Sequence, residues 1–190
     1  MKSIHGLSLV VALCAVPVMA DPMPRAPAGR SADNSFFVEG GGPGLLYSIN
    51  YERIVENDFG LRAGFSYTSF SASASSGGST ASASAAIITV PVIASYLGVS
   101  SGSHTLEMGA GGTIVFATGS ASGTGIAASG SGMTGLGTVI LGYRRQPVNG
   151  GFQFRIGLEA LVGKGLSLSN PDPNSFGVLP WMYMSLGFSL

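Results

Sequence analysis

The feature that most constrains the fold is a long alternation of apolar residues with small or polar ones. Between Phe59 and Tyr67 every second residue is Phe, Leu, Ala, Phe or Tyr, and the residues between them are Gly, Arg, Gly and Ser. The same period of two runs from Phe152 to Val162 and from Trp181 to Leu190. Because successive side chains of a β-strand point to opposite faces, the pattern predicts strands with one face in an apolar medium.

The lengths and spacing of these stretches predict a barrel. Runs of nine or more residues exceed the five or six usual in globular sheets and match the ~9–11 residues of a membrane-spanning strand. We predict eight strands, at residues 36–42, 44–55, 59–71, 86–98, 104–117, 133–146, 151–164 and 178–190. The connections alternate between short ones, at 56–58, 99–103 and 147–150, and long ones, at 72–85, 118–132 and 165–177. Short periplasmic turns and long outer loops are typical of outer-membrane barrels.

The first hairpin leaves two interpretations open. Residues 41–44 read Gly-Gly-Pro-Gly and form either a tight turn between two strands or a bulge within one long strand. Two strands give an even total, which places both chain ends on the periplasmic side. We therefore predict an all-β fold, an eight-stranded antiparallel up-and-down transmembrane β-barrel.

The composition excludes several other classes of protein. Nine basic and nine acidic residues make up 9% of the 190, whereas a soluble domain devotes about a quarter of its residues to charge. The sequence has no stripe of basic residues that could bind nucleic acid.

The long connections at 71–86 and 118–132 consist almost wholly of Ser, Ala, Gly and Thr, and such tracts are typical of flexible coils.

The N-terminal residues have the pattern of a secretory signal peptide. Lys2 precedes an apolar stretch at 6–18, and Val18 and Ala20 are small residues at the −3 and −1 positions of a cleavage site. We expect residues 1–20 to be a signal peptide cleaved after Ala20, residues 21–35 a Pro/Ala-rich periplasmic leader and residues 36–190 the barrel. The single cysteine, Cys14, lies in the cleaved part, so the mature chain has neither a disulfide nor a thiolate metal site.

Seven charged residues in the strands fall on the face opposite the apolar one. An outward Arg or Lys at mid-depth in lipid would cost about 2–4 kcal/mol, so we predict that these side chains face the barrel lumen. They are Glu39, Glu52, Arg62, Glu107, Arg144, Arg155 and Glu159. An eight-stranded barrel is just wide enough to be filled by side chains, which favours an ion-paired plug. The alternative is a charged lining for ion passage.

Aromatic residues gather near the predicted short turns and the C-terminus. Rings are favoured at membrane interfaces, so we predict that this group forms a periplasmic girdle. The group consists of Tyr51, Phe59, Tyr96, Tyr143, Phe152 and Phe188. A second group toward the long connections, Tyr67, Phe70, Phe116 and Phe176, is predicted to form an outer girdle. The alternative is that the rings belong to the core of a soluble β-sandwich.

Catalytic and metal-binding patterns are not found. A nucleophilic Ser needs an adjacent base, and the one histidine beyond the signal segment, His104, lies in a predicted periplasmic turn. No His, Cys or carboxylate cluster has the spacing of metal ligands. We therefore predict no catalytic residues, no metal and no cofactor.

Residues 36–190 resemble the small eight-stranded outer-membrane barrels of Gram-negative bacteria, of the OmpA/OmpX type. The first hairpin, from Glu39 to Glu52, resembles that of outer-membrane β-barrel domain proteins of unassigned function. The alternating ending resembles their C-terminal assembly signal, with Leu190 where an aromatic residue is usual. The resemblance implies a place in the outer-membrane lipid after insertion by the barrel assembly machinery.

The expected function is that of a non-catalytic outer-membrane barrel, structural or surface-exposed, with a lumen plugged by the Glu/Arg network. The alternative is a narrow channel or transporter for ions or small apolar molecules. We expect a monomer that binds no nucleic acid.

Overall fold

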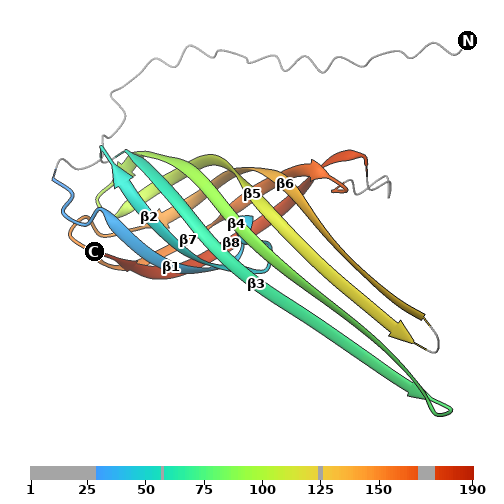
Figure 1. Ribbon diagram of the computed structural model, residues 1–190. Coiled ribbons are helices and arrows are strands. Elements are labelled where there is room, and N and C mark those ends of the chain that lie inside the picture. Colours follow the sequence, from blue (N-terminus) through green and yellow to red (C-terminus); the bar gives the residue numbers. More distant parts are fainter. Residues whose placement is uncertain (1–28, 57, 124–125, 167–173) are drawn as a thin grey trace, which may run out of the picture.

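The computed structural model is one closed barrel of eight antiparallel strands, described for residues 29–56, 58–123, 126–166 and 174–190 (Figure 1). Each strand pairs with its neighbours in the chain, and the first also pairs with the last. The strands are β1 (Asn34–Gly41), β2 (Tyr47–Val55), β3 (Phe59–Ser76), β4 (Ser79–Ser101), β5 (His104–Gly123), β6 (Ile126–Arg145), β7 (Gly151–Lys164) and β8 (Phe176–Ser189). The predicted all-β, eight-stranded, up-and-down architecture is confirmed.

The first hairpin consists of two strands. A short 3-10 helix, η1 (Gly42–Gly44), separates β1 from β2, and Gly41 and Gly42 have φ values of 69° and 70°. These are left-handed backbone conformations that glycine adopts without steric cost. The Gly-Gly-Pro-Gly sequence therefore forms a turn.

Buried and exposed residues alternate along the strands of the barrel wall, and along β2 the alternation is unbroken. One face of the wall lines the interior and the other faces outward. In the described ranges no helix is long and apolar enough to cross a membrane.

Strands β3 to β6 are much longer than the other four, and the prediction of flexible loops at 72–85 and 118–132 is wrong. They contain 18, 23, 20 and 20 residues, whereas β7 and β8 contain 14 each. β3 and β4 stay paired as far as Ser76 and Ser79, leaving only Gly77 and Gly78 as the turn. The β5–β6 hairpin is paired as far as Gly123 and Ile126, and residues 124–125 lie outside the described residues.

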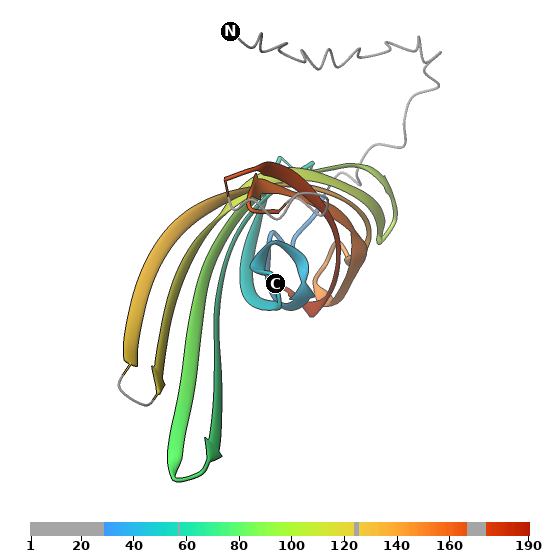
Figure 2. The same ribbon diagram turned by 90° about the vertical axis from the view of Figure 1, so that its right-hand side faces the viewer.

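The four long strands form one sheet that projects beyond the barrel. β4 and β5 remain paired out to Ser82 and Ser122, which joins the two hairpins side by side. We call residues 69–76, 79–86, 118–123 and 127–132 the extension. Figures 1 and 2 show it leaving the ring of strands on one side. The Ser/Ala tracts keep the period of two, and cross-strand pairing satisfies the backbone groups that face a neighbouring strand, which explains why a coil-like composition is folded here.

The end of the barrel opposite the extension carries the short connections and both ends of the described chain. Strand β4 continues to Ser101 through an irregularity between Tyr96 and Val99, so the predicted connection at 99–103 shrinks to Gly102 and Ser103. The expected signal peptide, and the leader up to residue 28, lie outside the described residues. The third predicted long loop lies between Lys164 and Phe176, and its residues 167–173 are also outside them.

Candidate functional site

The seven charged residues singled out in the sequence all occupy buried positions inside the barrel. None exposes more than 4% of its surface, and they come from six different strands. They are Glu39 on β1, Glu52 on β2, Arg62 on β3, Glu107 on β5, Arg144 on β6, and Arg155 and Glu159 on β7. The interior of the barrel is therefore the candidate site.

Two arginines and two glutamates form one cluster. Arg155 Nε donates to Glu107 Oε2 at 2.9 Å, and its Nη2 bonds to Glu107 Oε1 and lies 3.5 Å from Glu52 Oε1. Arg144 Nη2 bonds to Glu52 Oε2, and Arg144 Nη1 lies 3.9 Å from Glu107 Oε1. Ser95 Oγ adds a hydrogen bond of 2.9 Å to Glu107 Oε1. The cluster ties β2, β5, β6 and β7 together across the lumen.

Arg62 and Glu39 form a separate ion pair. Arg62 Nη1 donates to Glu39 Oε2 at 2.7 Å. The ring of Phe37 connects this pair with the cluster, because Arg155 Cζ lies 4.5 Å and Arg62 Cζ 5.7 Å from its centroid. A guanidinium over an aromatic face at these distances is a cation–π contact. Phe37 was not singled out from the sequence, although it shares the face of β1 that carries Glu39.

Glu159 stands apart from the other six. It exposes 4% of its surface, yet neither of its carboxylate oxygens has a hydrogen-bond partner in the described part of the chain. The three arginines are already engaged by Glu39, Glu52 and Glu107. The prediction grouped Glu159 with them, but the structure leaves it outside the ion-pair cluster.

Glycines on the inward positions make room for the large interior side chains. Tyr183 of β8 is 1% exposed, and a Cβ atom at Gly157 would lie 2.7 Å from its Cε1 atom. A Cβ at Gly142 would collide with the Tyr183 hydroxyl, and one at Gly187 with Phe37. Real Cβ atoms do not approach so closely, so these strands need glycine at the three positions.

The β1–β2 connection folds into the end of the lumen nearer the extension. Gly42, Pro43 and Gly44 are buried. Thr113 Oγ1 donates to the Pro43 carbonyl at 2.8 Å, and Thr89 Oγ1 donates to that of Gly44 at 3.3 Å. These bonds hold η1 against β4 and β5, on the inner face of the wall.

The segment before β1 lies across the opposite end. The backbone N–H groups of Ser31 and Ala32 donate to the Val148 carbonyl at 3.0 and 3.2 Å, and Ala32 is buried. Burial lowers the pKa of Arg30, and the nearby positive charge of Arg144 lowers it further. Sequence reasoning missed Arg30 because it precedes every strand and belongs to no alternating pattern.

A layer of neutral polar side chains lies next to this segment. Gln146 Nε2 donates to Ser35 Oγ at 3.1 Å, and Ser189 Oγ donates to Gln153 Oε1 at 3.1 Å. Ser35 Oγ in turn donates to Ser189 Oγ at 3.3 Å. These buried residues join β1, β7 and β8 on the side of the charged cluster that faces the segment before β1.

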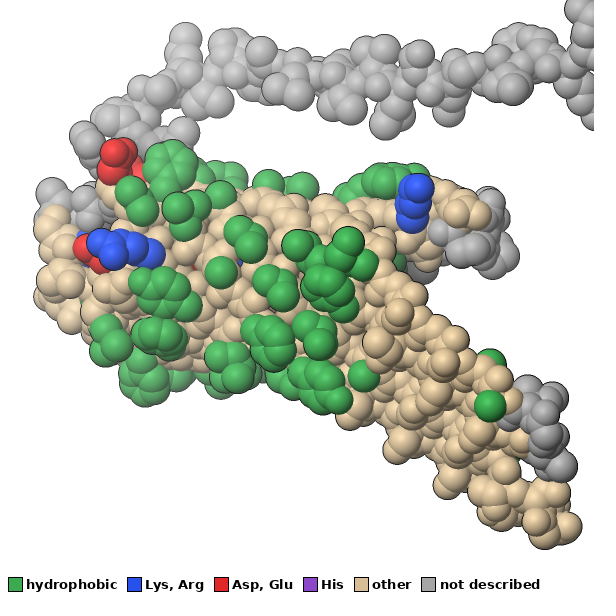
Figure 3. All heavy atoms as spheres, viewed as in Figure 1, with side chains coloured by type: hydrophobic (Ala, Val, Ile, Leu, Met, Phe, Trp, Pro, Cys, Tyr) green, Lys and Arg blue, Asp and Glu red, His purple; other side chains and the backbone are tan. Residues whose placement is uncertain are grey.

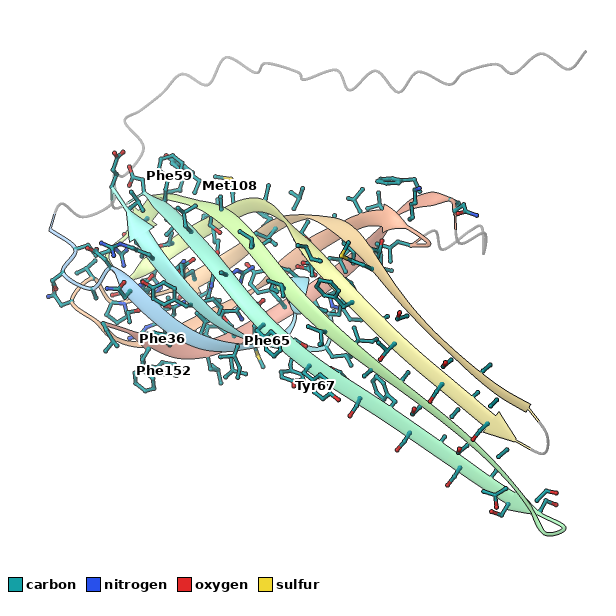
Figure 4. All side chains as sticks on the ribbon, in the orientation of Figure 1. Phe36, Phe59, Phe65, Tyr67, Met108 and Phe152 are labelled. Carbon is teal, nitrogen blue, oxygen red and sulfur yellow. The ribbon has the colours of Figure 1, made fainter. Side chains whose placement is uncertain are left out.

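The outward face of the barrel wall is apolar. Large aliphatic side chains on it expose between 51% and 66% of their surface, among them Val38, Ile49, Leu61, Val92, Val139, Leu158 and Met184. Figure 3 shows apolar side chains over the visible face of the barrel, with the visible charges at its two ends. In Figure 4 the labelled residues Phe36, Phe59, Phe65, Tyr67, Met108 and Phe152 point away from the barrel.

The six predicted girdle aromatics are exposed by 37–60% and lie on this outward face toward the short turns. Each packs against another ring, with centroid distances of 5.1 Å for Phe36–Tyr51, 5.5 Å for Phe59–Tyr96, 5.9 Å for His104–Tyr143 and 6.0 Å for Phe152–Phe188. His104, expected in a turn, is the exposed first residue of β5, and its Nδ1 lies 2.6 Å from Tyr143 Oη. In the second predicted group, Phe70 lies on the opposite face, because it shares the alternation of the inward-facing Arg62.

The apolar outward face ends abruptly in one row across the four long strands. Tyr67, Ile88, Phe116 and Met133 lie directly opposite one another from β3 to β6. The next outward row, toward the extension, is Ser69, Ala86, Thr118 and Ser131. Beyond it Ser71, Ser84, Ser120 and Ser129 follow, and Ser84 Oγ and Ser120 Oγ are 2.8 Å apart. The outward surface therefore changes from apolar to hydroxyl-bearing at a sharp boundary.

The other face of the extension is lined with alanine. A shallow groove of about 510 Å³ runs over it, lined by Ala72, Ala74, Ala81, Ala83, Ala121 and Ala128 among others.

As regards metals, no group of three or more His, Cys, Asp or Glu residues in the described ranges could hold an ion.

Comparison with known proteins finds similarity in structure only. No protein-family model matches the chain, and no curated protein matches it. The chain is similar to the crystal structure of Ail, the attachment invasion locus protein of Yersinia pestis, with 15% identity and a TM-score of 0.46 over 83% of this chain and 97% of Ail. It is likewise similar to Ail in complex with the heparin analogue sucrose octasulfate, with 14% identity and a TM-score of 0.45 over 82% and 96%. The barrel architecture of this chain rests on its own strand pairing, and the bound analogue is a property of Ail.

Proposed function

We propose that this protein is a non-catalytic integral barrel of the outer membrane, with a side-chain-filled lumen and an extension on the cell surface. The proposal rests on one observation, that charged and apolar side chains lie on opposite faces of the barrel wall. The seven charged residues in question are buried inside the ring, while the outward face of the same strands is apolar. A water-soluble barrel would need the reverse arrangement.

The outward face supports a membrane location. Apolar patches beyond a few hundred Å² are rare on soluble monomers, and here large apolar side chains are exposed on every strand. Along β3 the apolar outward positions run from Phe59 to Tyr67, nine residues that match a tilted membrane-spanning strand. The exposed aromatic pairs near the short turns fit a periplasmic interface, where rings are favoured.

The interior supports a filled lumen in place of a channel. Arg62, Arg144 and Arg155 reach across the ring to carboxylates on other strands, and Phe37 and Tyr183 occupy further space. The buried connection η1 lies at one end of the lumen, and residues 30–32 bond to the turn at Val148 at the other end. An eight-stranded barrel packed in this way leaves little room for an ion to pass.

A structural role agrees with the state of the carboxylates. A general acid or base needs contact with a substrate, whereas Glu52 and Glu107 are fully buried and hydrogen-bonded to arginines. The only described histidine, His104, is exposed and lies against Tyr143, with no carboxylate hydrogen-bonded to it.

Export is proposed from the N-terminal pattern alone, with cleavage after Ala20. N-terminal sequencing of the mature protein should then begin at Asp21.

Two measurements test the proposal. Unboiled protein from the membrane fraction should migrate differently from boiled protein on an SDS gel, because a folded barrel resists the detergent. Recovery in the soluble periplasm without such a shift would contradict the membrane assignment and favour a soluble β-protein.

Purified barrel in planar bilayers should give no reproducible single-channel conductance. A steady conductance that is lost on changing Arg62 or Glu107 would show that the charged residues line a path for ions. The channel alternative would then replace the filled lumen, while the membrane location would stand.

A further inference from the structure

The extension has two strand edges that no other described strand covers. Pairing of β2 with β3 ends at Ile49 and Phe65, so residues 69–76 of β3 pair with β4 alone. Pairing of β6 with β7 ends at Gly137 and Val162, so residues 127–135 of β6 pair with β5 alone. Each edge presents a row of unpaired backbone N–H and C=O groups.

Neither edge carries the usual protection against strand addition. Natural edge strands are commonly blocked by lysine, proline, a bulge or a covering segment. Residues 69–76 and 127–135 contain no charge and no proline, and all of them are exposed. Their pairing with β4 and β5 is regular throughout. With respect to the described residues, both edges are therefore open to another strand.

We propose that the β3 edge of one copy pairs with the β6 edge of a neighbouring copy, so that adjacent extensions join into one antiparallel sheet above the membrane. The proposal rests on the proposed membrane location, because copies inserted in one membrane all point the same way. In every copy β3 then runs outward and β6 runs back, since the strands are antiparallel. A β3 edge beside a neighbour's β6 edge continues the alternation of directions, whereas two β3 edges would be parallel.

The side chains also match in this arrangement. Inside the extension, residues of the same type lie opposite each other on neighbouring strands. Ser71 is opposite Ser84, Ser84 is opposite Ser120, and Ser120 is opposite Ser129. The register that opposes Ser71 to Ser129 of the neighbouring copy continues this row and opposes Ala72 to Ala128. It also opposes Phe70 to Gly130, where nothing lies within 4 Å of a would-be Cβ and the ring has room to lie.

A second copy fits the edges better than an unrelated protein does. The two edges have similar lengths, opposite directions and the same uncharged small residues, so one chain supplies both halves of the contact. The contact joins two different surfaces and is heterologous, and repetition gives chains or rings of more than two copies. One added strand is a smaller contact than the ~1,200–2,000 Å² of stable soluble complexes, so we expect a reversible association. This departs from the monomer expected from the sequence.

Disulfide trapping tests the proposal in liposomes that contain the purified barrel. We would replace Ser69 and Ser131 together with cysteine, because the register above opposes them between copies. Within one copy they are three strands apart, about 14 Å, which is too far for a disulfide. Mild oxidation should give a ladder of dimers, trimers and larger products.

Two further sets of variants control the result. Ser69→Cys alone and Ser131→Cys alone should give little dimer, and efficient dimers from Ser69→Cys alone would overturn the head-to-tail arrangement. In the paired-cysteine background, Ser71→Lys with Ser129→Lys should reduce the ladder at least fivefold by like-charge repulsion. Ser71→Lys with Ser129→Glu should restore it. Equal ladders from the two charge variants would contradict strand pairing.

The unboiled gel shift separates this proposal from the proposed function. A shifted monomer without a ladder means that the barrel is in the membrane and its edges do not pair, which overturns the association alone. Crosslinks formed in whole cells to other proteins, without self-crosslinks, would also overturn it and identify the edges as sites for a different partner. Loss of the shift would contradict the membrane barrel itself.

Discussion

Gly157 of β7 and Tyr183 of β8 are in contact inside the barrel, where a Cβ at Gly157 would lie 2.7 Å from Tyr183 Cε1 and 2.6 Å from the Leu141 carbonyl oxygen. The glycine thus sets the space that the tyrosine ring fills. Gly157→Ala should lower the free energy of unfolding by about 1–3 kcal/mol, because the backbone carbonyl cannot move aside. Urea unfolding in detergent micelles measures this change. Gly130→Ala, in the extension with nothing within 4 Å, is the matched control and should change stability little.

Removal of Arg155 should be among the most destabilising single changes in the barrel. Its guanidinium bonds to Glu107 and lies 3.5 Å from Glu52, so Arg155→Ala leaves buried carboxylates without their partner. We expect a loss of about 3–5 kcal/mol in urea unfolding, and a similar loss for Arg62→Ala. Arg53→Ala, which removes an exposed arginine from the outward face, should stay within about 0.5 kcal/mol. Equal effects of Arg155→Ala and Arg53→Ala would count against the interior placement.

The same substitution should lower stability at Glu107 but not at Glu159. Glu107→Gln removes the charge that Arg155 and Arg144 require, and should cost about 3 kcal/mol. Glu159→Gln replaces a buried carboxyl group whose oxygens have no hydrogen-bond partner in the described residues, so stability should be unchanged or higher. Unfolding midpoints of the two variants in one detergent decide the matter. A strong loss from Glu159→Gln would show that this carboxylate has an essential partner.

Shortening the extension should leave the barrel intact. Removing residues 71–74 and 81–84 together takes equal, paired lengths from β3 and β4 and keeps the Gly77-Gly78 turn and the alternation of faces. The unboiled gel shift and the urea midpoint should match those of the unaltered protein. Removing residues 61–64 and 91–94, an equal length inside the barrel wall, should abolish the shifted band. Loss of the shift in the first variant would mean that the extension is needed for folding.

The period of two was enough to predict the barrel, because each strand of the wall has one face toward the filled interior and the other toward the outside. The same alternation assigned the charged residues to one face, and Arg62 and Arg155 indeed lie on buried positions. It could not show which arginine meets which carboxylate, because those pairs join strands whose relative position depends on closure of the ring. The composition of residues 118–132 suggested coil, whereas the described residues among them, 118–123 and 126–132, are stabilised by pairing with β4 and within the β5–β6 hairpin.

Local sequence also could not reveal which segments lie at the two ends of the lumen. Gly42 and Pro43 predict a turn, but the inward fold of that turn depends on hydroxyls of Thr89 and Thr113 far along the chain. Arg30 carries no pattern of its own, and its place follows from the contact between Ala32 and the turn at Val148.

The pairing of β1 with β8 has a consequence for how the protein is made. Every other strand contact joins chain neighbours, whereas Ser35 pairs with Ser189, and the backbone groups of Asn34 and Leu190 bond to each other at 3.0 and 2.7 Å. Seven strands can therefore assemble as successive hairpins, but the ring stays open until the last strand arrives. In the proposed membrane location, the nascent sheet has two bare edges in lipid until that moment, and unpaired peptide groups are costly there. Biogenesis should thus pause in a half-open intermediate that needs shielding, and the timing of the last strand should set the rate of completion.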